Sequence, residues 1–148
     1  MQRKRVFLLL AAAIVVVALI LYPSTQCRVA GSDVAVSPPK AFAVSVLEGY
    51  AVGLTFNVTN RSNCEINSQS LRVVLQGLVY SDGRQVAQDT EDTEQVGGTL
   101  AAGQTRAFSH TFEPYFNYKP VKLLLKIEMT FAETGPLTVF DGEVSVPG

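Results

Sequence analysis

The side chains that most often perform catalysis are few and scattered in this chain. His110 is the only histidine among 148 residues, and a histidine acts as a general base or a metal ligand only together with partner groups. It shares strand parity with Phe108 and Phe112, which predicts a partly buried structural histidine. No serine lies in a Gly-x-Ser-x-Gly turn, so an activated serine nucleophile is not indicated. We therefore expect a protein that is not an enzyme and that uses no cofactor.

An acidic run is the other feature that could hold a ligand. Residues 89–94 place four carboxylates within six positions, and carboxylate oxygens are ligands that Ca²⁺ prefers. The run lacks the glycine-containing spacing of a calcium loop. Gly97 and Gly98 are not followed by the lysine of a phosphate-binding loop. The favoured interpretation is a solvated acidic sheet edge that discourages pairing with other strands, and no metal site is expected.

The two cysteines, Cys27 and Cys64, lie 37 positions apart. Outside the cytoplasm they could form a disulfide. In the loop-entropy model, closing that loop would stabilise the fold by about 4 kcal/mol. Two separate thiols are the alternative, because the sequence does not show whether the two Cα atoms are close.

Two Asn-x-Ser/Thr triplets begin at Asn57 and Asn60 and are candidate N-glycosylation sites in an exported domain. Strand alternation places Asn57 on the face opposite Leu54 and Phe56, and we therefore expect its side chain to be accessible.

The N-terminal segment before these residues has the features of a membrane anchor. Residues 6–22 are all apolar and would form a helix of about 26 Å, close to the thickness of a bilayer core. Arg3, Lys4 and Arg5 precede them, and the positive-inside rule then keeps the N-terminus cytoplasmic. We expect a single-pass protein of the cell membrane with a cytoplasmic start (1–5), a signal-anchor (6–22), a linker (23–39) and an extracytoplasmic domain (40–148). A cleaved signal peptide and a lipid-modified Cys27 are the alternatives.

The charge of the exported part argues against nucleic-acid binding. Beyond residue 30 there are 8 Lys or Arg and 13 Asp or Glu residues, a formal balance of −5. Binding to phosphates relies on clustered cations, and we expect no nucleic-acid partner.

From residue 40 onward, apolar residues recur with a period of two, which is typical of strands with one buried face. The clearest strand spans residues 121–131, and further strands are predicted at 42–46, 52–58, 71–79, 85–88, 105–113 and 137–146. Turn residues separate these runs, with Asp82-Gly83 as a hairpin signal. The pattern predicts an all-β fold, an immunoglobulin-like antiparallel two-sheet sandwich of about seven strands behind one N-terminal transmembrane helix.

Several segments between residues 40 and 146 carry a resemblance to a known family: 54–63, 71–75, 83–87, 99–105 and the closing hairpin through Gly135. They resemble the late-embryogenesis-abundant type 2 family, the water-stress and hypersensitive-response domain, although Arg61 replaces the family's proline. The resemblance implies a β-sandwich with a non-catalytic, stress-protective role. Residues 78–83 with 100–108 are also similar to the Phe-x-Leu-Tyr-Asp domains found behind bacterial and archaeal membrane anchors, and the architecture is similar to the anchored sandwich subunits of archaeal motility or surface filaments.

These observations favour a membrane-tethered protein that binds an envelope polymer, a lipid headgroup or a protein partner, or that protects against stress. Tyr115, Phe116, Asn117 and Tyr118 form the candidate partner surface, because three aromatic residues in four positions are unusual for a solvated loop. A loop that folds back to cap the core is the alternative. A subunit of a cell-surface assembly is the second functional hypothesis, and the oligomeric state stays open.

Overall fold

The computed structural model describes residues 27–148. The predicted basic start and signal-anchor lie outside these residues. Within 27–148, no helix has the length and apolar character that a membrane crossing needs.

The described chain is built from strands, apart from one short 3-10 turn, η1 (Gly31–Asp33). Seven strands are seven or more residues long, and two are short. In chain order the strands are β1 (Val34–Val36), β2 (Lys40–Val46), β3 (Gly49–Asn60), β4 (Ile66–Val79), β5 (Gln85–Gln95), β6 (Thr99–Leu100), β7 (Thr105–Thr111), β8 (Lys122–Phe131) and β9 (Gly135–Ser145).

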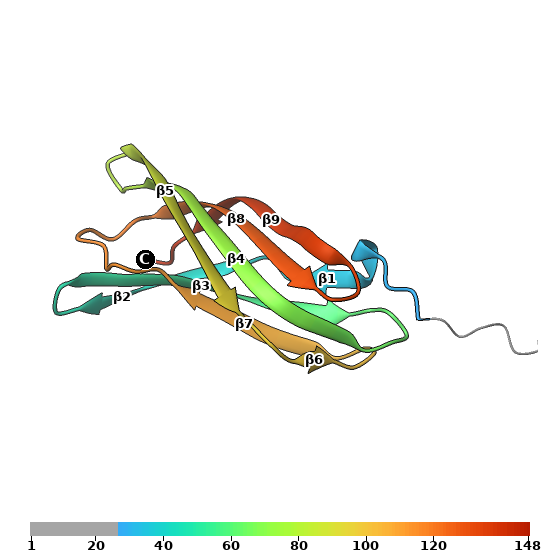
Figure 1. Ribbon diagram of the computed structural model, residues 1–148. Helices are drawn as coiled ribbons and strands as arrows, with labels where there is room; N and C mark the ends of the chain where they lie inside the picture. Colours follow the sequence, from blue (N-terminus) through green and yellow to red (C-terminus); the bar gives the residue numbers. More distant parts are fainter. Residues whose placement is uncertain (1–26) are drawn as a thin grey trace, which may run out of the picture.

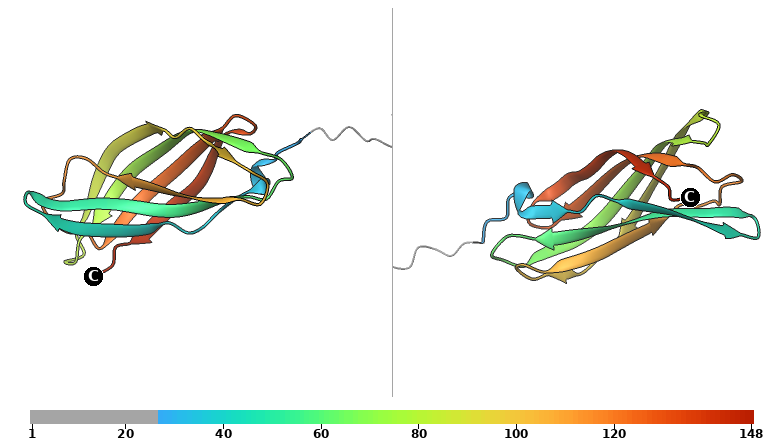
Figure 2. Two further views of the ribbon diagram at one scale, coloured as in Figure 1. Left: turned by 90° about the horizontal axis from the view of Figure 1, so that it is seen from below. Right: turned by 180° about the vertical axis from the view of Figure 1, so that it is seen from behind.

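The strands form two antiparallel sheets that face each other (Figures 1 and 2). In the first sheet, β3 is central: β1 and β2 pair with successive parts of one of its edges, and β7 pairs with the other edge. In the second sheet the order is β5-β4-β8-β9, and β6 pairs with the beginning of β4. The predicted all-β fold with two antiparallel sheets is confirmed.

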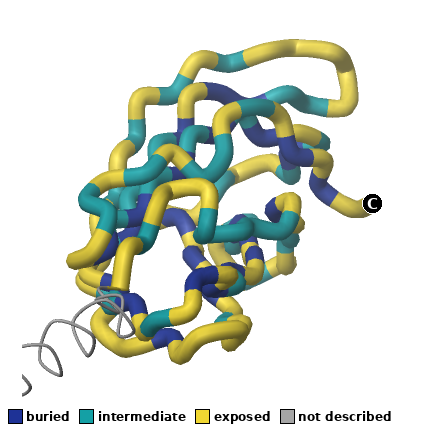
Figure 3. Tube along the Cα trace, turned by 90° about the vertical axis from the view of Figure 1, so that its right-hand side faces the viewer, coloured by how far each residue is buried: buried dark blue, intermediate teal, exposed yellow. Residues whose placement is uncertain are grey.

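The core lies between the two sheets, where the buried residues are concentrated (Figure 3). Along β8, buried and less buried residues alternate without a break from Leu123 to Phe131, as the period of two predicts. The largest contributions come from β3 (Val52, Leu54, Phe56, Val58), β4 (Leu71, Val73, Leu75, Leu78) and β8 (Leu123, Leu125, Ile127, Met129, Phe131), all at most 3% exposed.

One end of the sandwich, which we call the near end, holds the first described residue and the β3–β4 turn (Figure 1). Cys27 and Cys64 are joined there in a disulfide, with their Cα atoms 5.7 Å apart. The predicted pairing is thus present in the structure, and it fastens the segment before η1 to the β3–β4 turn.

Three details differ from the sequence prediction. β5 continues to Gln95, beyond the predicted 85–88, because its acidic residues pair with β4 although they bury no apolar side chain. The segment predicted as a linker, 23–39, contains η1 and β1, because Val34 and Val36 pair with the end of β3 and pack against the core. The strand count is nine rather than about seven, because β1 and β6 are too short to show an alternating pattern.

Candidate functional site

The large apolar side chains that remain exposed are gathered at the end of the sandwich opposite Cys27. Within residues 27–148 they are Val44, Leu47, Tyr115 and Tyr118, and Tyr118 is 66% exposed. They belong to the end of β2, the β2–β3 turn and the loop between β7 and β8. These segments and the β4–β5 turn lie together at what we call the far end (Figures 1 and 2). Clustered exposed apolar groups are typical of interaction sites.

The β7–β8 loop is fixed to the start of β3 at its middle. The Tyr50 N–H donates to the Phe116 carbonyl at 2.7 Å, and the Phe116 N–H donates to the Tyr50 carbonyl at 2.9 Å. The Phe116 ring packs edge-on against the buried Phe112 ring, with centroids 6.5 Å apart. Gly49 makes this approach possible: it has φ +132°, and a Cβ there would collide with the Phe116 carbonyl group.

The structure supports the core-capping alternative for Phe116 and leaves the neighbouring tyrosines exposed. Phe116 folds back onto the core and caps it, whereas Tyr115 and Tyr118 on either side stay exposed. Of the predicted partner surface, the structure therefore leaves the two tyrosines free to contact another molecule.

A hollow of about 280 Å³ opens beside this loop, and we call it the tyrosine hollow. Its walls include Tyr118 and Tyr80, whose rings meet edge-on with centroids 6.4 Å apart. Arg84 lies over the Tyr80 ring, 4.9 Å from its centroid, in a cation–π contact. The hollow is lined by Tyr80, Gln88, Thr90, Phe112, Glu113, Pro114, Tyr115, Phe116, Asn117 and Tyr118.

A second hollow, of about 460 Å³, is lined by Glu48, Glu113, Pro114, Tyr115 and Asn117. The two hollows share four of these residues. We call the two hollows together the far-end trough.

His110 is buried, as its strand parity predicted, and it is 4% exposed. Its ring lies edge-on to Phe112, and both ring nitrogens face carboxylates of β5: Nδ1 is 2.7 Å from Glu94 Oε1, and Nε2 is 3.1 Å from Asp92 Oδ2. The acidic run predicted a solvated sheet edge, but two of its carboxylates, those of Asp92 and Glu94, contact the buried His110 ring. In residues 27–148, no group of three or more His, Cys, Asp or Glu side chains could hold a metal ion.

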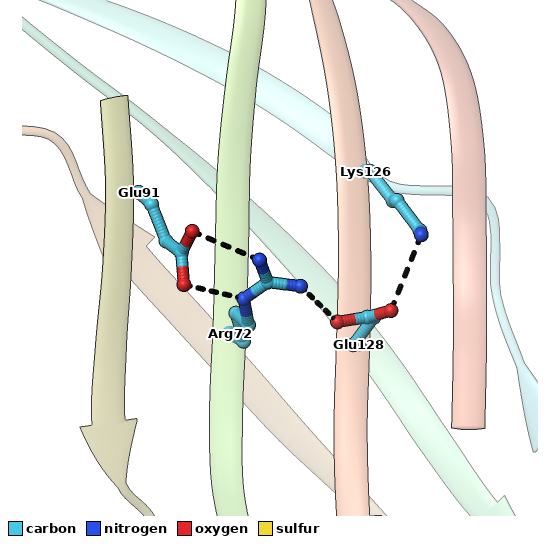
Figure 4. Close-up of polar contacts among 4 residues, drawn as sticks. All are labelled: Arg72, Glu91, Lys126 and Glu128. Carbon is cyan, nitrogen blue, oxygen red and sulfur yellow. Dashed lines mark hydrogen bonds and ion pairs between the residues drawn. The ribbon is translucent and has the colours of Figure 1, made fainter. Parts of the chain in front are cut away.

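The outer face of the second sheet is crossed by a row of alternating charges (Figure 4). Arg72 on β4 binds Glu91 of β5 through two nitrogens, at 2.6 and 2.8 Å, and also binds Glu128 of β8, which Lys126 contacts from its other side. Hydrogen bonds from Arg72 hold the pKa of Glu91 and that of Glu128 below the usual range, and Lys126 adds to the effect on Glu128. The same contacts raise the pKa of Arg72, which therefore stays charged. These charges are paired within the sheet and form a structural network.

The two candidate glycosylation residues have opposite surroundings. Asn57 is exposed on β3, as alternation predicted. Asn60 is fully buried, and its side-chain amide donates to the carbonyls of Cys64, Leu100 and Ala101. A glycan on that nitrogen would require these bonds to be broken, so Asn60 is corrected from a candidate glycan site to a structural residue of the near end.

No family model matches the chain, and no curated protein matches its sequence. Among solved structures, the structural genomics target SoR45 is similar in fold, with a TM-score of 0.50 and 10% identity over 79% of this chain and 89% of that one. The putative ApaA protein from Bordetella pertussis has a TM-score of 0.47 and 16% identity, over 78% of this chain and 94% of its own. Alkylpurine DNA glycosylase AlkC from Pseudomonas fluorescens has a TM-score of 0.46 and 11% identity, over 88% of this chain and 34% of its own. At these identities the likeness concerns the fold alone.

Proposed function

We propose that this protein is a membrane-tethered, non-catalytic binding module whose immunoglobulin-like sandwich stands outside the cytoplasm and presents its far end to an envelope polymer or a protein partner. The observation that supports this most is the placement of Val44, Leu47, Tyr115 and Tyr118. These exposed apolar side chains gather at the end farthest from Cys27, the first described residue after the predicted anchor. A tethered domain would offer that end to its surroundings.

Sequence features support the tether and the absence of catalysis. The apolar segment 6–22 behind three cations is typical of a signal-anchor. The resemblance to the late-embryogenesis-abundant type 2 family favours action by contact, including a stress-protective role.

The decisive experiment is recovery of bound material from native cells with the 148-residue chain and with the double variant Tyr115→Ser/Tyr118→Ser. Both tyrosines are exposed, so the variant should keep its unfolding temperature. We expect at least a fivefold loss of recovered partner. The exposed Gln69 and Thr138, at the near end, supply a control variant, Gln69→Ser/Thr138→Ser, that should recover as much partner as the unchanged chain. Equal recovery by all three proteins would refute the far-end surface.

A second candidate function, a subunit of a cell-surface assembly, is supported by the outer face of the first sheet. The exposed side chains of its β3 and β7 strands are neutral, among them Thr55, Asn57, Ala107 and Ser109, and nearby β2 adds only one charge, Lys40. A face without charges costs less to dehydrate against another protein than a charged face does. Mass measurement after mild detergent extraction separates the two functions: a defined oligomer supports the assembly subunit, and a monomer supports the solitary tether.

A further inference from the structure

We propose that the trough at the far end binds a neutral saccharide chain. This inference rests on the proposed function and names the ligand class of the same surface. It is drawn from the aromatic walls of the tyrosine hollow, from the hydrogen-bonding groups between them and from the charge of the lining.

The aromatic walls match the apolar faces of sugar rings. Tyr80, Tyr115 and Tyr118 line the tyrosine hollow, and a pyranose ring presents a face of C–H groups that packs on an aromatic ring. The Tyr80 ring is held between Arg84 on its face and Tyr118 at its edge. Such a preorganised wall loses little side-chain entropy when a ligand binds.

The polar groups of the trough match sugar hydroxyls, which both donate and accept hydrogen bonds. Gln88 and Asn117 offer amides with donor and acceptor atoms, Thr90 offers a hydroxyl, and Glu113 offers a carboxylate that only accepts. Within residues 27–148 these four side chains are not engaged in hydrogen bonds to one another or to their neighbours. They are therefore available to a ligand.

The charge of the lining selects a neutral ligand. No Lys, Arg or His is among the residues that line the tyrosine hollow or the adjoining one, whereas Glu113 lines both and Glu48 lines the second. Arg84 is stacked on Tyr80 and is not among the lining residues, so an acidic sugar or a phosphate headgroup would meet like charge from the lining, which costs affinity.

The shape of the trough favours a chain over a single sugar. The hollows, of about 280 and 460 Å³, share Glu113, Pro114, Tyr115 and Asn117, so a ligand of several units could contact the lining of both, which a single sugar could not. A proline-rich peptide is the main competitor, since such peptides also dock in aromatic grooves. It presents carbonyl acceptors and few N–H donors, and it would leave the shared Glu113 carboxylate unpaired. A saccharide can pair with the donors and with the acceptors of the lining, because its hydroxyls both accept and donate hydrogen bonds.

The test is a titration of the 148-residue chain, labelled on tyrosine rings, in lauryldimethylamine oxide, a detergent without a sugar headgroup. The probes are cellohexaose, chitohexaose, maltohexaose and mannohexaose, with hexagalacturonate as the acidic counterpart and decaproline as the peptide. We expect at least one neutral hexamer to shift the tyrosine resonances in a saturable manner. We also expect hexagalacturonate to bind at least tenfold more weakly than that hexamer.

Variants assign the binding to the trough. Tyr115→Ala and Tyr118→Ala should each weaken binding of the neutral hexamer about tenfold, or about 1.4 kcal/mol, and Asn117→Ala about threefold. The exposed Thr138→Ala, at the near end, should leave it unchanged. The proposal is overturned if none of the neutral hexamers binds, or if decaproline or hexagalacturonate binds more tightly than all of them. If partner recovery from cells still depends on Tyr115 and Tyr118, only the ligand class fails; if it does not, the proposed function fails as well.

Discussion

His110 of β7 contacts Glu94 of β5, with Nδ1 2.7 Å from the Glu94 carboxylate, and so joins the edge of one sheet to the edge of the other. Asp92 faces the second ring nitrogen at 3.1 Å. The three side chains close the β5–β7 side of the sandwich with a polar contact where the core ends.

Replacing His110 with Phe should therefore lower the free energy of unfolding by about 1–3 kcal/mol, because the ring space stays filled but the polar contacts of the buried ring with Asp92 and Glu94 are lost. Urea unfolding of the 148-residue chain measures the change. The neighbouring Ser109 is exposed on the opposite face, and Ser109→Ala should have almost no effect. If His110→Phe is as stable as the unchanged protein, the contact does not stabilise the fold.

The charge row on the second sheet predicts a specific acid dependence. Unfolded glutamate titrates near pH 4.3, and Arg72 lowers the pKa of Glu91 and Glu128 in the folded protein. Their contribution is therefore present in full above the unfolded pKa and is lost as the pH falls through the folded values. Arg72→Met should make the loss of stability between about pH 5 and pH 3 less steep.

Urea unfolding at pH 7, 5, 4 and 3 measures this slope. Lys122→Met serves as the control. The Lys122 ammonium pairs with the exposed Glu143 carboxylate at 3.4 Å, so this substitution should leave the slope nearly unchanged. Parallel curves for Arg72→Met and the unchanged chain would contradict the assigned role of Arg72.

Asn60 should be among the least replaceable polar residues of the near end. Its amide donates to three carbonyls, and its oxygen accepts from the N–H and the hydroxyl of Ser62. Asn60→Ala leaves those groups without partners and should destabilise the fold by about 3 kcal/mol. Asn57→Ala, on the exposed face of the same strand, should change stability by less than about 0.5 kcal/mol. Thermal unfolding of the two variants compares them directly.

Gly49 should be required for the position of the β7–β8 loop. Gly49 and Gly83 both have positive φ, but only Gly49 faces another segment, the Phe116 carbonyl, whereas Gly83 faces open space. Alanine at either site should cost about 1 kcal/mol of backbone strain. Gly49→Ala should in addition speed hydrogen exchange at the Tyr50 and Phe116 amides. Equal exchange in the two variants would show that the loop does not depend on this approach.

Alternation in the sequence predicted most of the long strands, because burial on one face imposes a period of two on them. β5 is the exception: it continues to Gln95, beyond the predicted 85–88, because residues 89–95 are all polar or charged and show no apolar alternation. β3, β4, β8 and β9 lie where the pattern indicated, and His110 shares the buried face with Phe108 and Phe112 as expected. The aromatic loop was singled out from composition alone.

Contacts between sheets could not be predicted in the same way. From the sequence, Asp92 and Glu94 are expected to face solvent, because no residue near them in the chain indicates that His110 of the other sheet packs against them. Asn60 matches a glycosylation triplet, but its side-chain amide is hydrogen-bonded to three carbonyls from residues up to 41 positions away. The far-end trough likewise depends on three turns that meet only in the folded chain.

The disulfide between Cys27 and Cys64 determines how the domain would respond to mechanical load. A pull between the segment before Cys27 and a ligand held at the far end enters the β3–β4 turn directly through the sulfur bridge. Residues 28–63, with β1, β2 and β3, form a covalently closed loop that this pull cannot peel away strand by strand. Reducing agents should therefore lower the unfolding force of the domain in single-molecule stretching from its N-terminal side.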